Sequence, residues 1–215
     1  KISFKSRSKK VRALSDPNHR FVPFFGSSEW SRMDAMHPSV LAEAYNRSYT
    51  PYLLGQKGAA SLTQFFGIQQ IIPQMTKKQA VYVISPQWFV KTGANSAAFQ
   101  SFFSSDQMVR FLRSQRGTTY DRYAAKRFLK LYPEASMAEM MEKVAKGQEL
   151  SKADRGRLKV MQKVLEKEDN FYSQFAVSSR NYDGKITKKA AKLPKNFSYD
   201  TLSNRADKLA AKATD

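Results

Sequence analysis

The stretch RFVPFFGSSEW, residues 20–30, contains both a structural signal and a candidate nucleophile. Its apolar run lies between the turn-forming letters DPN and GSS and has the length and aromatic content of a short buried strand, although Pro23 counts against a central strand. Two serines follow at the expected carboxyl end of this strand, where a helix is predicted to begin. The first question is therefore whether Ser27 or Ser28 is a nucleophile, or whether the pair only forms a turn.

The segments after this stretch alternate between helix and strand. In order they are HPSVLAEAYNR (37–47, helix), YTPYLLG (49–55, strand), AASLTQFFGIQQII (59–72, helix) and QAVYVIS (79–85, strand). The last is a near-continuous apolar run, which is typical of a parallel strand covered by helices on both faces. The alternation predicts an α/β class with a doubly wound, flavodoxin-like parallel sheet, and residues 20–96 are expected to form the first half of that core.

In residues 97–178 the alternation of helix and strand gives way to successive helical patterns, which predict a helical insertion. Amphipathic helices are expected over 97–115, 119–133, 136–147 and 151–175. Capping boxes at Ser136/Glu139 and Ser151/Asp154 predict the starts of the last two. The Met and aromatic stripes of these helices are interpreted as packing faces.

The two ends of the chain differ from the core in composition. Residues 1–19 form a basic lead-in that is expected to be solvated, and residues 179–215 are expected to be a linker and the start of a further helix returning to the core. Because the chain begins with Lys1 and ends at Asp215 inside a helix-like segment, both ends look cut. The sequence therefore leaves room for an N-terminal anchor or a C-terminal half outside these 215 residues.

The charge of the chain is its strongest compositional signal. It has 37 Lys and Arg residues against 18 Asp and Glu, a formal charge of +19 at pH 7. Such a field attracts polyanions, which include nucleic acid, an anionic membrane surface and a phosphate-rich wall polymer. The absence of cysteine excludes disulfides, thiolate metal sites and a Cys nucleophile. No apolar run approaches the ~18 residues of a membrane span.

Ser28 is the better placed of the two serines. It follows the first strand, where doubly wound folds bind ligands, and it lies at a predicted helix start, where free N–H groups stabilise an oxyanion. The same facts suit a simple cap and turn, and on pattern alone that interpretation is favoured.

A serine nucleophile also needs a base, and the chain has only two histidines. His19 precedes the first strand and is expected at the surface. Asp34 and His37 have the D-x-x-H spacing of some serine hydrolases, but in a helix His37 would lie ~13.5 Å from Ser28 and on its opposite side. His37 is therefore expected to act locally, at the entry of the next helix, with a bend before Pro38 as the alternative.

Three motifs in order, FFGSSEWSRMDAMHPS, YLLGQKGAASL and VISPQWF, resemble the DltD family of D-alanine transfer proteins, which belongs to the SGNH/GDSL-like hydrolases. The resemblance covers residues 20–112 by motif. It implies an α/β/α fold with Ser28 as nucleophile, matching Gly26 and Ser27 to the rest of the first block. Gly58 matches the glycine of the second block, whose N–H faces the oxyanion.

The third block departs from the superfamily pattern. An Asn is usual there, whereas Gln87 follows the third strand in this chain, either as an amide donor or as a support for the loop. The late D-x-x-H has no match in this chain. The resemblance implies that the catalytic Asp and His lie beyond residue 215, so these 215 residues alone are expected to show little turnover.

The resemblance implies a function in the cell envelope. Its members are anchored by an N-terminal membrane segment and act on the extracellular face of Gram-positive bacteria, moving D-alanine onto the poly(glycerol phosphate) of lipoteichoic acid. Implied partners are a D-alanyl carrier protein or a membrane acyltransferase, with no nucleic acid, cofactor or metal. The alternatives are a non-catalytic or thioesterase partner that binds the carrier protein, and a basic polyanion-binding module, which leaves the three motifs unexplained.

Overall fold

A three-stranded parallel sheet lies at the centre of the chain. The computed structural model describes residues 2–91, 93–175 and 182–212. The strands are β1 (Phe21–Phe25), β2 (Thr50–Leu54) and β3 (Val81–Tyr82), and β1 pairs with β2 on one side and with β3 on the other. The predicted α/β class with a parallel sheet is confirmed.

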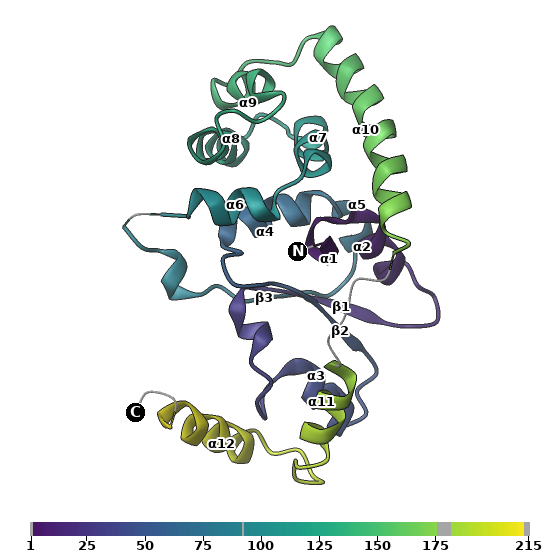
Figure 1. The fold of residues 1–215 in the computed structure, drawn as a ribbon, viewed down its shortest axis with the longest axis vertical. Coiled ribbons are helices and arrows are strands. Elements are labelled where there is room, and N and C mark those ends of the chain that lie inside the picture. Colours follow the sequence, from purple (N-terminus) through teal and green to yellow (C-terminus); the bar gives the residue numbers. More distant parts are fainter. Residues whose placement is uncertain (1, 92, 176–181, 213–215) are drawn as a thin grey trace.

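Helices lie on both faces of this sheet, as the doubly wound pattern predicted (Figure 1). One face carries α1 (Ile2–Lys5), α2 (Arg7–Leu14), α4 (Ser61–Gln69), α5 (Ile72–Met75) and α6 (Ser96–Phe102). On the other side α3 (Pro38–Ala44) lies next to β2, α11 (Tyr182–Ala190) packs on α3, and α12 (Tyr199–Ala211) lies further from the sheet. The expected linker at 179–181 lies outside the described residues, and two helices follow where one was expected.

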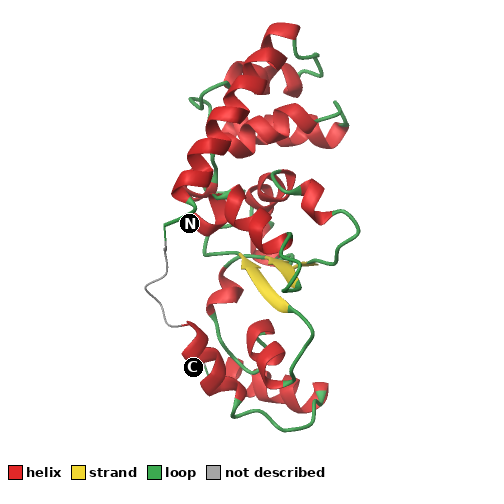
Figure 2. Ribbon diagram, turned by 90° about the vertical axis from the view of Figure 1, so that its right-hand side faces the viewer, coloured by secondary structure: helices red, strands yellow, loops and turns green. Residues whose placement is uncertain are grey.

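The predicted helical region stands apart from the sheet, on the far side of α4 and α6 (Figure 2). It consists of α7 (Ser105–Ser114), α8 (Thr119–Leu131), α9 (Ala138–Ala145) and α10 (Lys152–Tyr172). Residues 97–115 form two helices rather than one, because Phe103 is extended and Ser104 caps a new helix through a capping box with Gln107. None of the helices in the three described ranges is long and apolar enough to cross a membrane.

The capping predictions for α9 and α10 have different outcomes. The box at Ser151/Asp154 is confirmed. The box at Ser136/Glu139 is wrong, because α9 begins after Met137, whose φ of 66° lies in the left-handed region. The side chain of Met137 is buried in the core. The capping pattern alone therefore does not predict where α9 begins.

Phe66 of α4 joins the helical region to the sheet. It is fully buried, and its ring lies edge-on or tilted against Phe65, Phe99, Phe103, Phe111 and Phe128 at centroid distances of 5.1–6.1 Å. Aromatic pairs in this distance range are stabilising beyond the area they bury. The main apolar core therefore lies between α4 and α6–α10, and a smaller cluster formed by Leu14, Phe25, Leu54 and Ile71 packs against the sheet.

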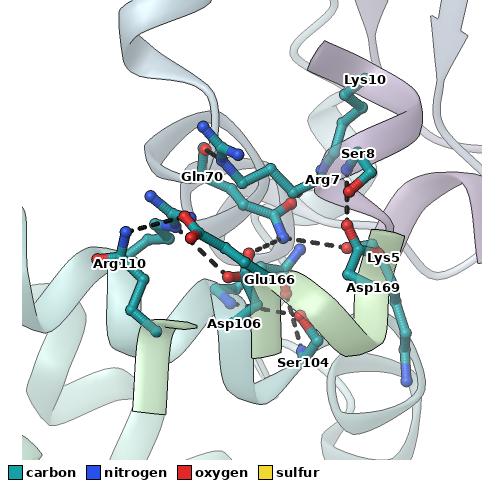
Figure 3. A network of polar contacts seen from close by, with 12 residues as sticks. Lys5, Arg7, Ser8, Lys10, Gln70, Ser104, Asp106, Arg110, Glu166 and Asp169 are labelled. Carbon is teal, nitrogen blue, oxygen red and sulfur yellow. Dashed lines mark hydrogen bonds and ion pairs between the residues drawn. The ribbon is translucent and has the colours of Figure 1, made fainter. Parts of the chain in front are cut away.

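The basic lead-in is not the solvated segment expected from its composition. It forms α1 and α2, and both Phe4 and Leu14 are buried. Lys10 is also buried, with 1% of its surface exposed, and its ammonium donates to the Phe4 carbonyl and to Gln70 Oε1. Gln70 in turn donates to Asp106, so the lead-in is tied to α4 and α7 through polar groups that lie far along the chain (Figure 3).

The third strand differs from the expectation of burial on both faces. Val81, Tyr82 and Ile84 are 39%, 41% and 59% exposed. The strand pairs only with β1 and has no second neighbour among the described residues. The apolar run therefore occupies an edge strand, where a parallel strand keeps part of its surface open.

The buried Lys10 predicts a pH dependence of stability. Burial lowers the pKa of Lys10 from 10.5 to about 7. Between these values the unfolded chain holds a proton that the folded chain lacks, so the free energy of unfolding rises with pH. In Lys10→Met this rise is lost, a difference of about 2 kcal/mol between pH 7 and 9 by urea unfolding.

Lys126→Met is the control, because Lys126 is exposed on α8. It should keep the dependence of the parent protein. An equal rise with pH in the parent and in Lys10→Met would contradict the prediction.

Candidate functional site

The three predicted site segments emerge at one edge of the sheet. Gly26 to Ser28 follow β1, Gly55 to Gly58 follow β2, and Ser85 to Gln87 follow β3. Because all three strands are parallel, their carboxyl ends meet at the same edge. Since β1 is central, with β2 and β3 on opposite sides, the loop after β1 lies at a topological switch point, where open α/β sheets bind ligands.

The two serines after β1 have different environments. Ser27 is buried, and its hydroxyl donates to the Gln56 carbonyl at 3.1 Å. Ser28 opens a short 3₁₀ helix, η1 (Ser28–Ser31), and is partly exposed. Among the described residues none hydrogen-bonds to Ser28 Oγ. The capping interpretation does not fit Ser28, because the N-cap position belongs to Ser27 and no side chain caps this helix.

Two glycines allow the turn to be this tight. A Cβ on Gly55 would lie 2.5 Å from the backbone carbon and oxygen of Gly26, and one on Gly26 would lie 2.0 Å from Glu29 Oε1. Glu29 Oε1 accepts a hydrogen bond from the Ser27 N–H. A side chain at Gly55 therefore displaces the backbone that leads into Ser28, whereas one at Gly26 displaces the side chains of Glu29 and Trp30.

Gln64 of α4 is a positioning residue that the sequence analysis did not single out. Its side-chain amide donates to the carbonyl of Gly26 and to that of Leu54, the last residue of β2, at 3.1 Å. Gln64 is fully buried and so is held between the ends of two strands. The available signal was a glutamine inside the apolar helix 59–72, where a buried amide must find partners.

Trp30 covers the same turn from the other side. Its ring lies edge-on to Phe24 with centroids 5.8 Å apart, and Cβ atoms added at Gly26 and Gly55 would each meet its indole within 2.6 Å. Its indole N–H is buried and has no acceptor among the described residues. The turn before Ser28 thus packs between the indole and Gln64.

Gly58 and Gln87 lie in the other two loops of this edge. Gly58 has φ +93°, in the left-handed region where glycine is favoured, within the turn closed by Ala59 N–H and the Gln56 carbonyl at 2.9 Å. The same Gln56 carbonyl accepts from Ser27, so this turn is tied to the serine loop. Gln87 lies in η2 (Pro86–Trp88) and is exposed. Their contribution to an oxyanion hole stays a prediction.

His37 has the local role expected of it. Its Nδ1 accepts from the Ser39 N–H at 3.2 Å as the N-cap of α3, and its Nε2 lies 3.4 Å from the Trp30 carbonyl. This arrangement requires the proton on Nε2 and leaves no nitrogen for Ser28. Burial lowers the pKa of His37, which favours the neutral ring. Asp34 accepts instead from the Met36 N–H at 2.8 Å.

His19 is at the opposite end of β1, as expected. It is exposed and pairs with Asp16 at 2.9 Å. The described residues hold no group of three His, Cys, Asp or Glu side chains that could bind a metal ion. The edge therefore presents an unpaired serine hydroxyl and loop N–H groups, and within the described ranges neither histidine serves that hydroxyl as a base.

Comparison with known proteins gives one consistent family. The DltD protein family model matches residues 1–215. Protein DltD of Lacticaseibacillus rhamnosus is 38% identical over 200 residues, which cover 90% of this chain and 46% of that protein. Protein DltD of Bacillus subtilis (strain 168) is 32% identical over 165 residues, covering 74% of this chain and 42% of that protein.

A third relative, Protein DltD of Staphylococcus aureus (strain NCTC 8325 / PS 47), is 26% identical over 130 residues, or 60% of this chain and 33% of that protein. The chain spans less than half the length of these curated relatives. With a family model that covers every residue and a relative that matches nine tenths of it, the chain belongs to the DltD family.

Proposed function

We propose that this chain carries the nucleophile for serine acyl transfer, and that the acyl group is D-alanine moved onto lipoteichoic acid. The observation that carries the proposal is the Ser28 hydroxyl, which is unpaired among the described residues at the switch point of the sheet. Membership of the DltD family supports the choice of acyl group.

The chemistry would proceed in two balanced steps. Ser28 Oγ attacks the carbonyl carbon of a D-alanyl ester or thioester, its proton passes to a base, and the alcohol or thiol leaves. A hydroxyl of the glycerol phosphate chain then attacks the D-alanyl ester on Ser28, which regains its proton. Backbone N–H groups at the start of η1 and at Gly58, with the Gln87 amide, are the proposed oxyanion donors.

The base is expected to come from outside the residues described here. His37 and His19 are both committed elsewhere, as their hydrogen bonds indicate. We propose that the acid and base follow residue 215, in sequence that the longer relatives contain. Without them residues 1–215 should lose about 10²–10⁴-fold in rate.

The charge of +19 is proposed to serve the acceptor. Lipoteichoic acid is a polyphosphate, so a basic protein gathers it near the surface. The proposed donor is a D-alanyl carrier protein or a membrane acyltransferase, and the proposed location is the extracellular face of the cell membrane through an N-terminal anchor.

One alternative has an observation in its favour. Since neither histidine in the described residues serves Ser28 Oγ as a base, the chain could instead bind the carrier protein without catalysis. A thioesterase, which passes the acyl group to water, is the second alternative. Covalent labelling of Ser28 distinguishes an active serine from non-catalytic binding. Transfer of D-alanine to the polymer rather than to water distinguishes the proposed transferase from a thioesterase.

Ser28 is tested with a serine-directed fluorophosphonate on protein that continues past residue 215. We expect an adduct at Ser28 that is abolished in Ser28→Ala and retained in the control Ser31→Ala, because Ser31 is exposed at the far end of η1. Mass spectrometry of the labelled peptide gives the readout. Absence of an adduct at Ser28 in the parent protein sinks the catalytic proposal.

The close approach of Gly55 to Gly26 predicts a second effect. In Gly55→Ala the new Cβ forces the Gly26 backbone away, and we expect labelling of Ser28 to slow by roughly tenfold or more, since small displacements cost large factors in rate. Unfolding should require about 1–3 kcal/mol less free energy.

Gly156→Ala is the matched control on α10. A Cβ there meets nothing within 4 Å, so helix propensity should raise stability by about 0.5–1 kcal/mol without any change in labelling. Equal labelling rates in Gly55→Ala and Gly156→Ala would show that the glycine contact does not position Ser28.

A further inference from the structure

A cavity lies beside the last turn of α4, at the end of that helix away from the Gly58 loop. It has a volume of about 610 Å³ and is lined by four arginines, Arg7 of α2, Arg110 and Arg113 of α7, and Arg116 just beyond α7. We call it the arginine pocket. Its other walls include Phe65 and Gln69 from α4. Because α4 starts after β2 and runs back along the sheet for nine residues, its last turn lies about 13.5 Å from the edge where it began.

Two of the four arginines have structural partners. Arg7 donates its Nε–H to the Gln70 carbonyl at 3.2 Å, which satisfies a carbonyl at the end of α4. Arg110 pairs with Asp106 at 3.4 Å and with Glu166 (Figure 3). Burial first, and then the positive charge of Arg110, lower the pKa of Arg7, so these two cations repel each other across the pocket.

Arg113 and Arg116 have no such partners. Both are exposed, and within the described part of the chain neither guanidinium has an ion pair or a hydrogen bond. The carboxylate of Asp121, which also lines the pocket, accepts from the N–H groups of Arg116 and Thr118 and from the Thr118 hydroxyl. These hydrogen bonds hold the Asp121 carboxylate at the start of α8, where it keeps its negative charge but forms no ion pair with either guanidinium.

The lining has a chemical preference. Guanidinium groups match the oxygens of a phosphate with paired hydrogen bonds and stay charged at all physiological pH values. Phe65, Ile72 and Pro73 add an apolar wall, which a bare inorganic ion would not need. A cavity of this size also exceeds what one such ion requires and is typical of sites for organic ligands.

We propose that the arginine pocket binds the phosphate groups of an organic phosphodiester chain, as a site separate from Ser28. Arg113 and Arg116 contact the phosphate oxygens, while Arg7 and Arg110, fixed by Gln70, Asp106 and Glu166, supply the positive wall behind them. None of the lining residues belongs to the three loops of the serine edge. That the chain is a glycerol phosphate polymer rests on the proposed function, whereas phosphate recognition rests on these residues alone.

The test is the affinity for a synthetic oligo(glycerol phosphate) at 0.15 M salt, in the Ser28→Ala background so that acyl chemistry plays no part. Arg113→Gln with Arg116→Gln should raise the Kd by about tenfold or more, because charge-assisted hydrogen bonds are lost. The control is Lys188→Gln with Lys189→Gln, which removes the same charge from exposed positions at the end of α11. It should change the Kd less than about twofold, since distant surface charges are screened.

Two further arms identify the source of the phosphate. Inorganic phosphate should compete only weakly, and phosphatidylglycerol vesicles should bind the arginine and lysine double variants alike. If the two double variants weaken oligomer binding equally, binding depends on the overall positive charge and not on the arginine pocket, and the proposal is overturned. Phosphate as effective as the oligomer, or loss of vesicle binding only in the arginine variant, would also overturn it, in favour of a simple anion site or a membrane contact.

Fluorophosphonate labelling of Ser28 in the otherwise unchanged arginine double variant keeps the two proposals distinguishable. Labelling should proceed at the parent rate. If the oligomer binds as expected while Ser28 is not labelled, the phosphate site is supported and the proposed function is overturned. If Ser28 is labelled while the arginine variant binds the oligomer as well as the parent protein does, the proposed function is supported and the phosphate site is overturned.

Discussion

The structure depends on the two opposite faces of one nine-residue helix, α4. Gln64 and Phe66 are two residues apart, which is about 200° around a helix, so their side chains leave it in opposite directions. Gln64 donates to the carbonyls of Gly26 and Leu54 at the ends of two strands, and Phe66 is the centre of the aromatic core of the helical region. Neither the sheet edge nor the helical region is positioned independently of this helix.

This constraint explains how a sheet of three short strands holds the tight turn before Ser28 in place. The small sheet has only a minor apolar cluster of its own, whereas α4 packs into the large aromatic one. The fixed helix then holds Gln64 against the turn, and the Gly26–Gly55 contact leaves the backbone before Ser28 no room to relax. Packing of α4 against the helical region therefore also fixes the turn before Ser28, where the local residues alone would provide little stability.

The sequence predicts the features that depend on local pattern and misses those that depend on distant partners. Apolar runs and turn residues are enough for the three strands, their parallel order and the placement of Ser28. The burial of the lead-in was not predictable from its composition, because Lys10 donates to Gln70 as well as to Phe4, and Gln70, which is 60 residues away, in turn donates to Asp106. Gln64 was missed for the same reason. α9 begins after the buried Met137 without a side-chain cap, so the capping pattern did not predict its start, and β3 is exposed where it has no second neighbour among the described residues.

The direction of α4 also bears on how charge is divided between the two proposed sites. A helix dipole places partial positive charge at its first turn and partial negative charge at its last. The first turn of α4 follows the loop of Gly58, where a developing oxyanion is proposed, and the last turn ends at Gln70, whose carbonyl accepts from Arg7. Arg7 is thus accounted for by the helix end, and Arg110 by its two acids. No such local partner exists for Arg113 and Arg116 within the described residues, and because both side chains are exposed, their guanidinium groups are accessible to a dissolved anion. The proposed phosphate ligand would supply these two groups with the counter-charge that the described residues do not.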